Sequence, residues 1–146
     1  MEEPMQTVLQ EYQFWKKSIV VLRGDLEELE QELQQVPAVG VSSMDASGVH
    51  SLAVKQSQEE AILLHNEQIQ KEIQTKKLSL MRLEHRVHSV ERAIAVLSKT
   101  DKDIITRRYI EGMTWENTAM WVQASVGYCR KHAKQALENL ARVYIT

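Results

Sequence analysis

Apolar residues recur at alternating steps of three and four along residues 5–36, and this spacing constrains the fold more than any other feature of the chain. The repeat puts nine residues on one helical face: Val8, Tyr12, Trp15, Ile19, Leu22, Leu26, Leu29, Leu33 and Val36. Such steps define the a and d positions of a coiled-coil heptad, because they keep one apolar seam facing a partner helix. We therefore predict a long helix over 5–36 that buries this seam against another helix.

A second heptad pattern runs over residues 57–97, and its seam contains Ile62, Ile69, Ile73, Leu80, Leu83, Val87, Val90, Ile94 and Leu97. The same frame places Asn66 at an a position, where a polar residue can fix the register, and Lys76 at a d position, from which its ammonium group can extend to solvent. This helix could fold back on the first as an antiparallel hairpin, or each helix could pair with its copy in a second chain. Periodicity does not separate these arrangements; we favour the hairpin, with self-association in addition.

The two heptad segments are separated by residues 37–57. Pro37 ends the first helix, because proline lacks a backbone N–H and clashes with the preceding turn. A stretch rich in serine and glycine follows it. We expect residues 37–57 to form a mobile loop within a helical hairpin or coiled-coil region over 1–97, and we expect a separate domain over 98–146.

Residues 98–146 carry the signals of three short helices. Ser98 or Thr100 can cap the first, Thr114 the second and Ser125 the third, since a hydroxyl at such a position accepts a bond from a free backbone N–H. Gly112 suits the end of the first helix, because glycine takes a left-handed conformation at low cost. We predict an all-α chain that ends in a trihelical helix-turn-helix module. Its expected core is Ile105, Tyr109, Met113, Ala119, Val122, Cys129, Ala136, Leu137 and Leu140.

The order of residues from Leu97 to Leu140 resembles region four of bacterial sigma factors. The matching positions are Leu97, Ile104, Ile105, Arg108-Tyr109, Glu111-Gly112, Thr114-Trp115, Ala119, Ser125 and Ala136-Leu137 with Leu140. One departure is Gln123, which stands where the family usually has a glycine in the turn and which can adopt a left-handed backbone at some cost. The layout of the whole chain is similar to the RinA/ArpU-like regulators of phage late or autolysin genes.

The resemblance implies that the helix beginning at Ser125 enters the major groove of double-stranded DNA. The positions that touch bases in sigma factors then fall on Val126, Gly127, Arg130 and Lys131, and Arg130 suits bidentate pairing with guanine. We expect further contacts with bases or phosphates from Tyr128 and Lys134, and a phosphate contact at the helix start near Thr114. The alternative for the cationic residues is an ordinary solvated helix face. Trp121, off the core stripe, is expected to pack on the coiled coil or on a partner protein.

Charge is unevenly distributed, although the whole chain has 18 basic and 20 acidic residues and a net charge of −2. Residues 98–146 hold 8 Lys or Arg and 5 Asp or Glu, a net +3, whereas residues 1–97 hold 10 and 15, a net −5. The basic excess therefore accompanies the predicted DNA reader, as expected for binding to a polyanion. The absence of a signal peptide or an apolar run of membrane-spanning length favours the cytoplasm and argues against a membrane partner. The resemblance to phage regulators implies that this is the cytoplasm of a bacterial host cell.

No catalytic or cofactor motif stands out. The single cysteine, Cys129, allows neither a disulfide nor a cysteine zinc site, and His85 and His88 are expected to be exposed without further ligands. We therefore predict no enzyme activity, no cofactor and no metal.

Three functions remain open. The favoured one is a sequence-specific transcriptional regulator of phage origin, whose coil forms homo-oligomers or contacts RNA polymerase. The alternatives are a small terminase-like subunit that recognises DNA for phage genome packaging, and a coiled-coil adaptor without DNA binding.

Overall fold

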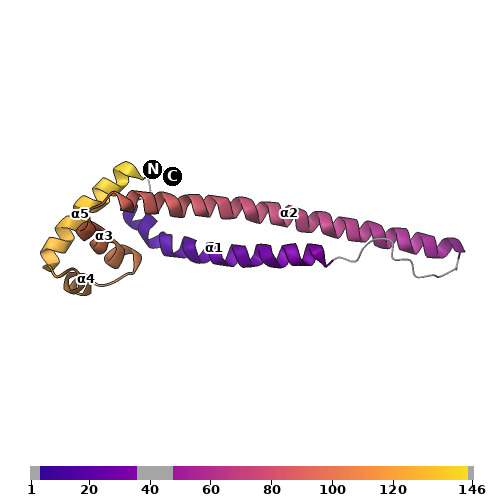
Figure 1. The fold of residues 1–146 in the computed structure, drawn as a ribbon, viewed down its shortest axis with the longest axis horizontal. Helices are drawn as coiled ribbons and strands as arrows, with labels where there is room; N and C mark the ends of the chain where they lie inside the picture. The colour runs from indigo at the N-terminus through magenta and orange to yellow at the C-terminus, as the bar shows by residue number, and fades with distance from the viewer. Residues whose placement is uncertain (1–3, 36–47, 145–146) are drawn as a thin grey trace. The chain divides into compact units, whose positions relative to one another are not determined.

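The computed structural model describes residues 4–35 and 48–144, and of residues 48–55 it describes the backbone alone. The described chain is all-α. In order, its elements are α1 (Met5–Gln34), α2 (Gly48–Ala95), α3 (Lys99–Ile105), the π-helical turn η1 (Thr106–Ile110), α4 (Trp115–Val122) and α5 (Val126–Val143) (Figure 1). The predicted architecture, a long helical hairpin followed by three short helices, is confirmed.

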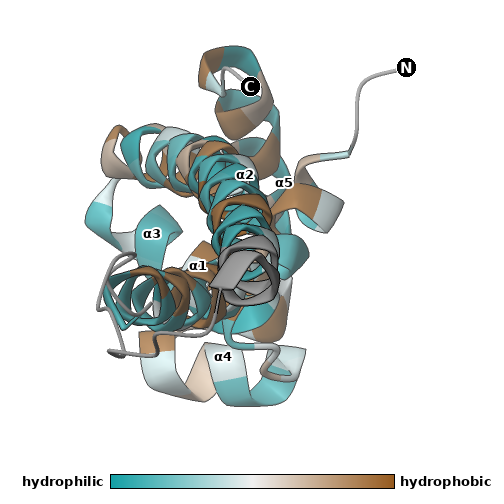
Figure 2. Cartoon of the chain, turned by 90° about the vertical axis from the view of Figure 1, so that its right-hand side faces the viewer, coloured by the Kyte–Doolittle hydropathy of each residue, from teal (hydrophilic) through white to brown (hydrophobic). Residues whose placement is uncertain are grey.

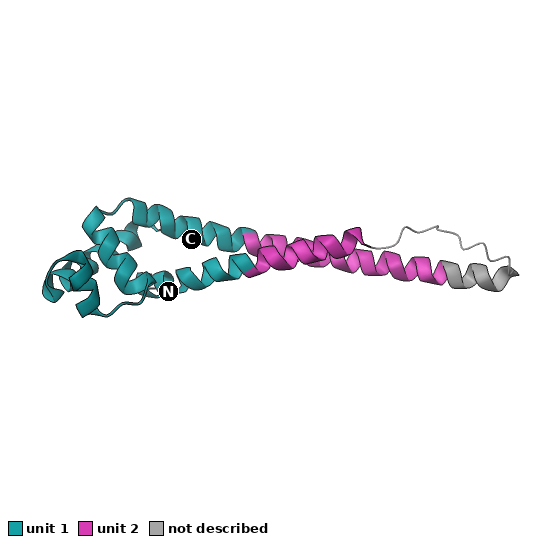
Figure 3. Cartoon of the chain, turned by 60° about the horizontal axis from the view of Figure 1, so that its bottom comes forward, with its two compact units in different colours: residues 1–20, 81–146 teal, residues 21–80 magenta. Residues whose placement is uncertain are grey.

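Two compact units divide the chain (Figure 3). The first contains Met1–Val20 and Met81–Thr146, and the second contains Val21–Leu80. This division differs from the predicted boundary between residues 97 and 98. The reason is that the first turns of α1 and the last turns of α2 belong to the same compact unit as the three short helices.

The second unit is an antiparallel pair formed by the later part of α1 and the earlier part of α2. Leu26, Ile69 and Ile73 are buried at its centre, and the partly buried leucines that pack against them are Leu29, Leu33 and Leu80. All six residues belong to the two predicted seams. The two helices therefore pair within one chain, as the favoured hairpin requires, and the expected self-association stays a prediction.

Ion pairs along the edges of this unit show that the two helices run in opposite directions. Asp25 Oδ2 lies 3.5 Å from Lys76 Nζ, whereas Glu32 Oε1, further along α1, lies 3.2 Å from Nε2 of His65, which is earlier in α2. These pairs are largely exposed, so each contributes little to stability. The Lys76 contact nevertheless confirms that a lysine at a seam position extends its charge toward the edge. Asn66, the other polar seam residue, is partly buried, and its Oδ1 has no hydrogen-bond partner.

The predicted loop over 37–57 is wrong for its second half. Residues 48–57 are helical, because α2 begins at Gly48 rather than at residue 57. After that glycine the segment contains neither glycine nor proline, so nothing in its backbone prevents the helix from extending toward the N-terminus. The remainder of the predicted loop, 37–47, lies outside the described residues.

Every α-helix of the first unit contributes fully buried side chains. These side chains come from α1 (Val8, Leu9), α2 (Val90), α3 (Ile104, Ile105), α4 (Thr118) and α5 (Cys129, Leu140). Hydropathy varies around the helices, with brown and teal residues on each, as expected when one side of a helix is buried (Figure 2). Of the predicted trihelical core, Ile105, Ala119, Cys129, Ala136 and Leu140 are buried, while Tyr109, Met113, Val122 and Leu137 are only partly buried.

Tyr12 and Trp15 serve this packing, as the heptad pattern predicts. Both are buried, and the guanidinium carbon of Arg86 lies 5.5 Å from the centroid of the Trp15 ring. Burial, helped by the nearby Glu91 carboxylate, raises the pKa of Tyr12 above its usual 10.0.

In the part of the chain that the structure describes, no helix is both long and apolar enough to cross a membrane.

Candidate functional site

The segment before the candidate site contains a π-helical turn that the sequence did not predict. α3 begins as expected, with Ser98 Oγ accepting a hydrogen bond from the N–H of Asp101 at 3.3 Å. From Thr106 the helix widens, and the N–H of Glu111 donates to the carbonyl of Thr106 at 2.8 Å. Gly112 then reverses the chain with the predicted positive φ of 75°. Single π-turns of this kind occur frequently at functional sites.

α4 and α5 form the predicted helix-turn-helix. Thr114 Oγ1 accepts a hydrogen bond from the N–H of Asn117 at 3.1 Å, and Ser125 Oγ accepts one from the N–H of Tyr128 at 3.0 Å, so both predicted caps are confirmed. Between the helices, Gln123 adopts the left-handed conformation expected of it, with φ 61° and ψ 45°. The caps fix the first turns of both helices, because they satisfy backbone donors that have no partner within the helix.

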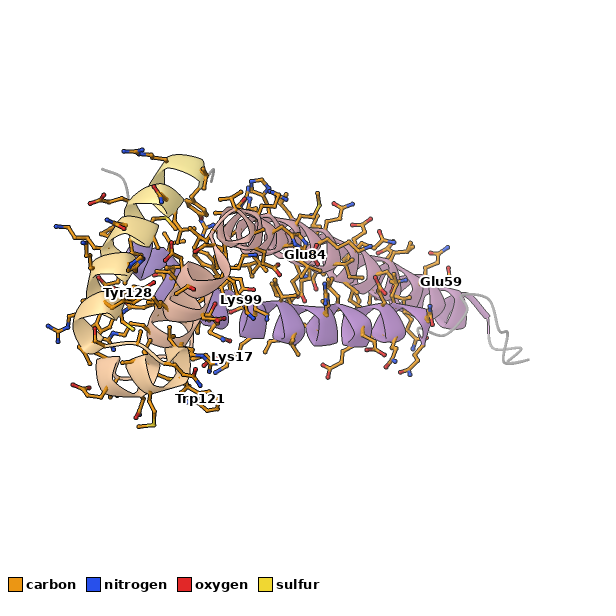
Figure 4. The ribbon with its side chains drawn as sticks, turned by 60° about the vertical axis from the view of Figure 1, so that its left-hand side comes forward. Lys17, Glu59, Glu84, Lys99, Trp121 and Tyr128 are labelled. Carbon is orange, nitrogen blue, oxygen red and sulfur yellow. The ribbon has the colours of Figure 1, made fainter. Side chains whose placement is uncertain are left out.

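The two sides of α5 differ sharply. One side is buried and contains Cys129, Ala133, Ala136 and Leu140. The other side is exposed, and most of the predicted DNA-contacting residues lie on it: Gly127, Tyr128, Arg130, Lys131 and Lys134. Val126 is partly buried, while Thr114 and Ser125 are exposed with their hydroxyls engaged as caps. Figure 4 shows the side chains that project from α5, with Tyr128 labelled.

The exposed side of α5 is also cationic. No acidic residue occurs between Glu116 and Glu138, whereas Arg130, Lys131 and Lys134 fall within this interval. We call the exposed residues Gly127, Tyr128, Arg130, Lys131 and Lys134 the α5 surface. Its positive charge would attract a negatively charged ligand.

Arg130 is exposed but not isolated. Its guanidinium carbon lies 5.7 Å from the centroid of the Trp115 ring at the start of α4. The guanidinium carbon of Arg108 lies 4.8 Å from the same centroid, and Tyr109 packs edge-on against the indole at 6.1 Å and 89°. Distances below about 6 Å permit a favourable cation–π attraction. These contacts join η1, α4 and α5 around one indole ring.

Sequence analysis did not identify Trp115 and Arg108 as site residues; it used them only as positions in the sigma-like pattern. Arg108 and Arg130 both contact the Trp115 ring, and this cluster joins three elements that meet only in the folded chain, so no helical period connects them. A weaker signal was available, because arginine and tryptophan flank the turn that Gly112 was predicted to make.

Tyr128 is held by a neighbour on its own helix. Its ring stacks on that of His132, with centroids 4.0 Å apart and an interplanar angle of 29°. Nδ1 of His132 in turn lies 3.4 Å from Oδ1 of Asp101, a buried oxygen that accepts no hydrogen bond. This pair is therefore an ionic contact when the imidazole is protonated. Stacking limits the ring of Tyr128, which stays 42% exposed, to a narrower set of orientations.

Trp121 is not covered by the coiled coil in the way that was expected. It is 63% exposed, and its ring lies beneath Arg107, whose guanidinium carbon is 4.5 Å from the ring centroid. The other expectation, packing against a partner protein, stays a prediction.

Groups that could support catalysis or metal binding are sparse in the described parts of the chain. Across residues 4–35 and 48–144, no three His, Cys, Asp or Glu side chains come together as metal ligands. His85 and His88 are both exposed, and His88 Nδ1 lies 3.3 Å from Glu91 Oε1. Burial raises the pKa of the Cys129 thiol above its usual 9.0, which disfavours the reactive thiolate.

The chain belongs to the family described as "Protein of unknown function (DUF722)", and the match extends over residues 21–142. Comparison with curated proteins and with solved structures gave no match. The family description specifies no activity, so the case for function depends on the α5 surface and on the helix-turn-helix that presents it.

Proposed function

We propose that this protein is a sequence-specific, double-stranded DNA-binding transcriptional regulator that reads the major groove with the first turns of α5. By its resemblance to RinA/ArpU-like regulators, it would be phage-encoded and act in the cytoplasm of the bacterial host. Its coiled coil would form homo-oligomers or contact RNA polymerase.

The observation that carries this proposal is the separation of charge and burial on α5. Its buried side packs into the core of the first unit, so the helix is held firmly, while Arg130, Lys131 and Lys134 stay exposed on the other side. A firmly held helix with exposed cations can present side chains to base edges without first refolding, which lowers the entropic cost of binding.

The proposal gives a role to each cationic residue of the α5 surface and to two residues beside it. Arg130 would pair with guanine O6 and N7, and Lys131 would contact a base or a phosphate. Lys134 would contact phosphate, as would the start of α4 near Thr114. Val126 would meet a thymine methyl group.

Gly127 adds support from the protein's own packing. A Cβ atom built at this position meets no atom within 4 Å, so the fold does not require a glycine there. Glycine costs about 1 kcal/mol relative to alanine inside a helix. A bound duplex that approaches the backbone closely would explain why the position carries no side chain.

The test begins with selection of duplexes that bind the full chain, followed by titration of the selected and a scrambled duplex. Arg130→Ala should weaken binding to the selected duplex by about 5- to 150-fold more than binding to the scrambled one. Lys134→Ala should instead weaken both equally and reduce the salt slope by about one. Arg142→Ala is the matched control, because Arg142 is also exposed but lies in the last turn of α5.

Two results would redirect the proposal. If no duplex binds even at low salt, the adaptor alternative is favoured and DNA reading is excluded. If specific binding accompanies a ring-shaped oligomer in light scattering, the packaging alternative is favoured over transcriptional regulation.

A further inference from the structure

We propose that Trp115 is a positioning residue for Arg130, and that the protein's discrimination between DNA sequences depends on this indole although the indole itself reads no base. The inference rests on the proposed function and goes beyond it, since none of the predicted DNA contacts includes Trp115. A residue at the start of α4 would then influence which DNA sequence a residue of α5 prefers.

The indole is a firm platform because contacts from two other residues restrict it. Tyr109 packs edge-on against it, and the guanidinium group of Arg108 lies 4.8 Å from its centroid. Arg108 is itself anchored, because its Nη1 donates a hydrogen bond to the carbonyl of Met113 at 2.8 Å. Arg108 and Tyr109 both belong to η1, so the unpredicted π-turn supplies the groups that hold the ring.

Arg130 completes the cluster from the exposed side of α5. Its guanidinium carbon is 5.7 Å from the indole centroid, within range of a cation–π contact. Among the described residues no carboxylate forms an ion pair with it. The indole therefore restrains the side chain without neutralising the charge that a base edge or a phosphate would meet.

Restraint of this kind helps binding for two reasons. An exposed arginine samples many rotamers, and the entropy lost when DNA fixes it in one rotamer lowers the affinity. A side chain that is already held near one rotamer loses less entropy on binding. A cation–π contact also occupies none of the guanidinium N–H donors, so they stay available for hydrogen bonds. The contact with Trp115 and pairing with guanine are then compatible.

The contact between Arg130 and Trp115 is weak enough to restrain the arginine without preventing it from pairing with guanine. An exposed cation–π contact corresponds to a factor of about 2–5 in an equilibrium constant. A bidentate arginine–guanine pair corresponds to a factor of about 5–150. Guanine therefore competes successfully for Arg130 if the two contacts conflict, while a wrong base offers no comparable gain.

The test is a double-mutant cycle on the full chain with Trp115→Leu and Arg130→Ala. The measured quantity is the discrimination ratio, defined as the dissociation constant for the scrambled duplex divided by that for the selected duplex. We expect Trp115→Leu to lower this ratio about two- to fivefold. We expect no further loss when Trp115→Leu is added to Arg130→Ala, because the restrained side chain is already absent.

Trp121→Leu is the matched control. It removes the other tryptophan of α4, whose ring contacts Arg107 rather than a residue of α5. The discrimination ratio should be unchanged in this variant. If Trp121→Leu lowers the ratio as much as Trp115→Leu does, the effect is not specific to the contact with Arg130 and the inference is overturned.

Failure of this inference can be distinguished from failure of the proposed function. Absence of duplex binding by the unmodified chain removes the proposed function. Strong discrimination by the unmodified chain, with equal losses from Trp115→Leu in the presence and absence of Arg130, removes only the positioning role. If circular dichroism shows that Trp115→Leu is unfolded, the same cycle is run with Trp115→Phe, which keeps a ring but a weaker cation–π face; losses independent of Arg130 would again overturn the inference.

Discussion

Replacing Gln123 with glycine should stabilise the protein, because this residue holds a left-handed backbone in the turn between α4 and α5. Its φ of 61° and ψ of 45° are at the centre of the region that residues with a Cβ atom avoid. The avoided conformation costs about 1–2 kcal/mol. Glycine removes this cost but loses about 0.4–1 kcal/mol through the greater freedom of the unfolded chain.

The midpoints of these two ranges, about 1.5 and about 0.7 kcal/mol, predict a net stabilisation of about 0.8 kcal/mol for Gln123→Gly. The side chain is exposed, so its removal creates no cavity that would offset the gain. For a chain of this length the melting temperature should rise by about 2–4 °C. Urea denaturation followed by circular dichroism measures the free energy of unfolding directly.

Gln135→Gly is the matched control for this prediction. Gln135 is also an exposed glutamine, but it lies within α5, where its backbone is helical. The same substitution should there destabilise the protein by about 1 kcal/mol. The reasoning is refuted if both substitutions destabilise the protein, because the turn would then gain nothing from a glycine.

Three further predictions follow from the same structure. Gly127→Ala and Gly24→Ala should both raise the free energy of unfolding by about 0.5–1 kcal/mol, because neither new Cβ meets an atom within 4 Å. Only Gly127→Ala should also weaken binding to a selected duplex. Equal effects of the two substitutions on binding would contradict a close approach of DNA at Gly127. Ser125→Ala removes the cap of α5 and should lower stability by about 1 kcal/mol in urea denaturation, whereas an unchanged midpoint would show that the cap is not needed. The raised pKa values of Cys129 and Tyr12 mean that the folded state holds these protons more tightly than the unfolded state. Their contribution to the free energy of unfolding should therefore be fully present below about pH 9 and should be lost as the pH rises further. Cys129→Ala should reduce this loss, and a free energy of unfolding that increases above about pH 9 would contradict the assignment.

The helical hairpin was predictable because a heptad records packing directly in the sequence. Every seam position that the structure describes in α2, including Asn66 and Lys76, is buried or partly buried. The start of α2 was not predictable to the same degree. Serine and glycine before residue 57 indicate a loop by composition, yet the conformation of such a segment depends on its neighbours as well as on its own preferences.

The candidate site was also predictable only in part from the sequence. The caps at Thr114 and Ser125 were predictable because a cap is a local arrangement of a hydroxyl and a backbone N–H three residues later. The cluster around Trp115 was not, since its members come from η1, α4 and α5 and meet only through tertiary packing. The π-turn that presents Arg108 to the indole has no simple sequence signature either, because it adds a residue to a helix whose composition is ordinary.

The central claim, that the α5 surface meets duplex DNA, is tested most directly by nuclear magnetic resonance of the full chain. Amide signals would be compared before and after addition of a selected duplex. The account predicts that the largest changes fall on residues 126–134 and at the start of α4 near Thr114. Largest changes in the second unit, Val21–Leu80, with the α5 signals unmoved, would contradict it.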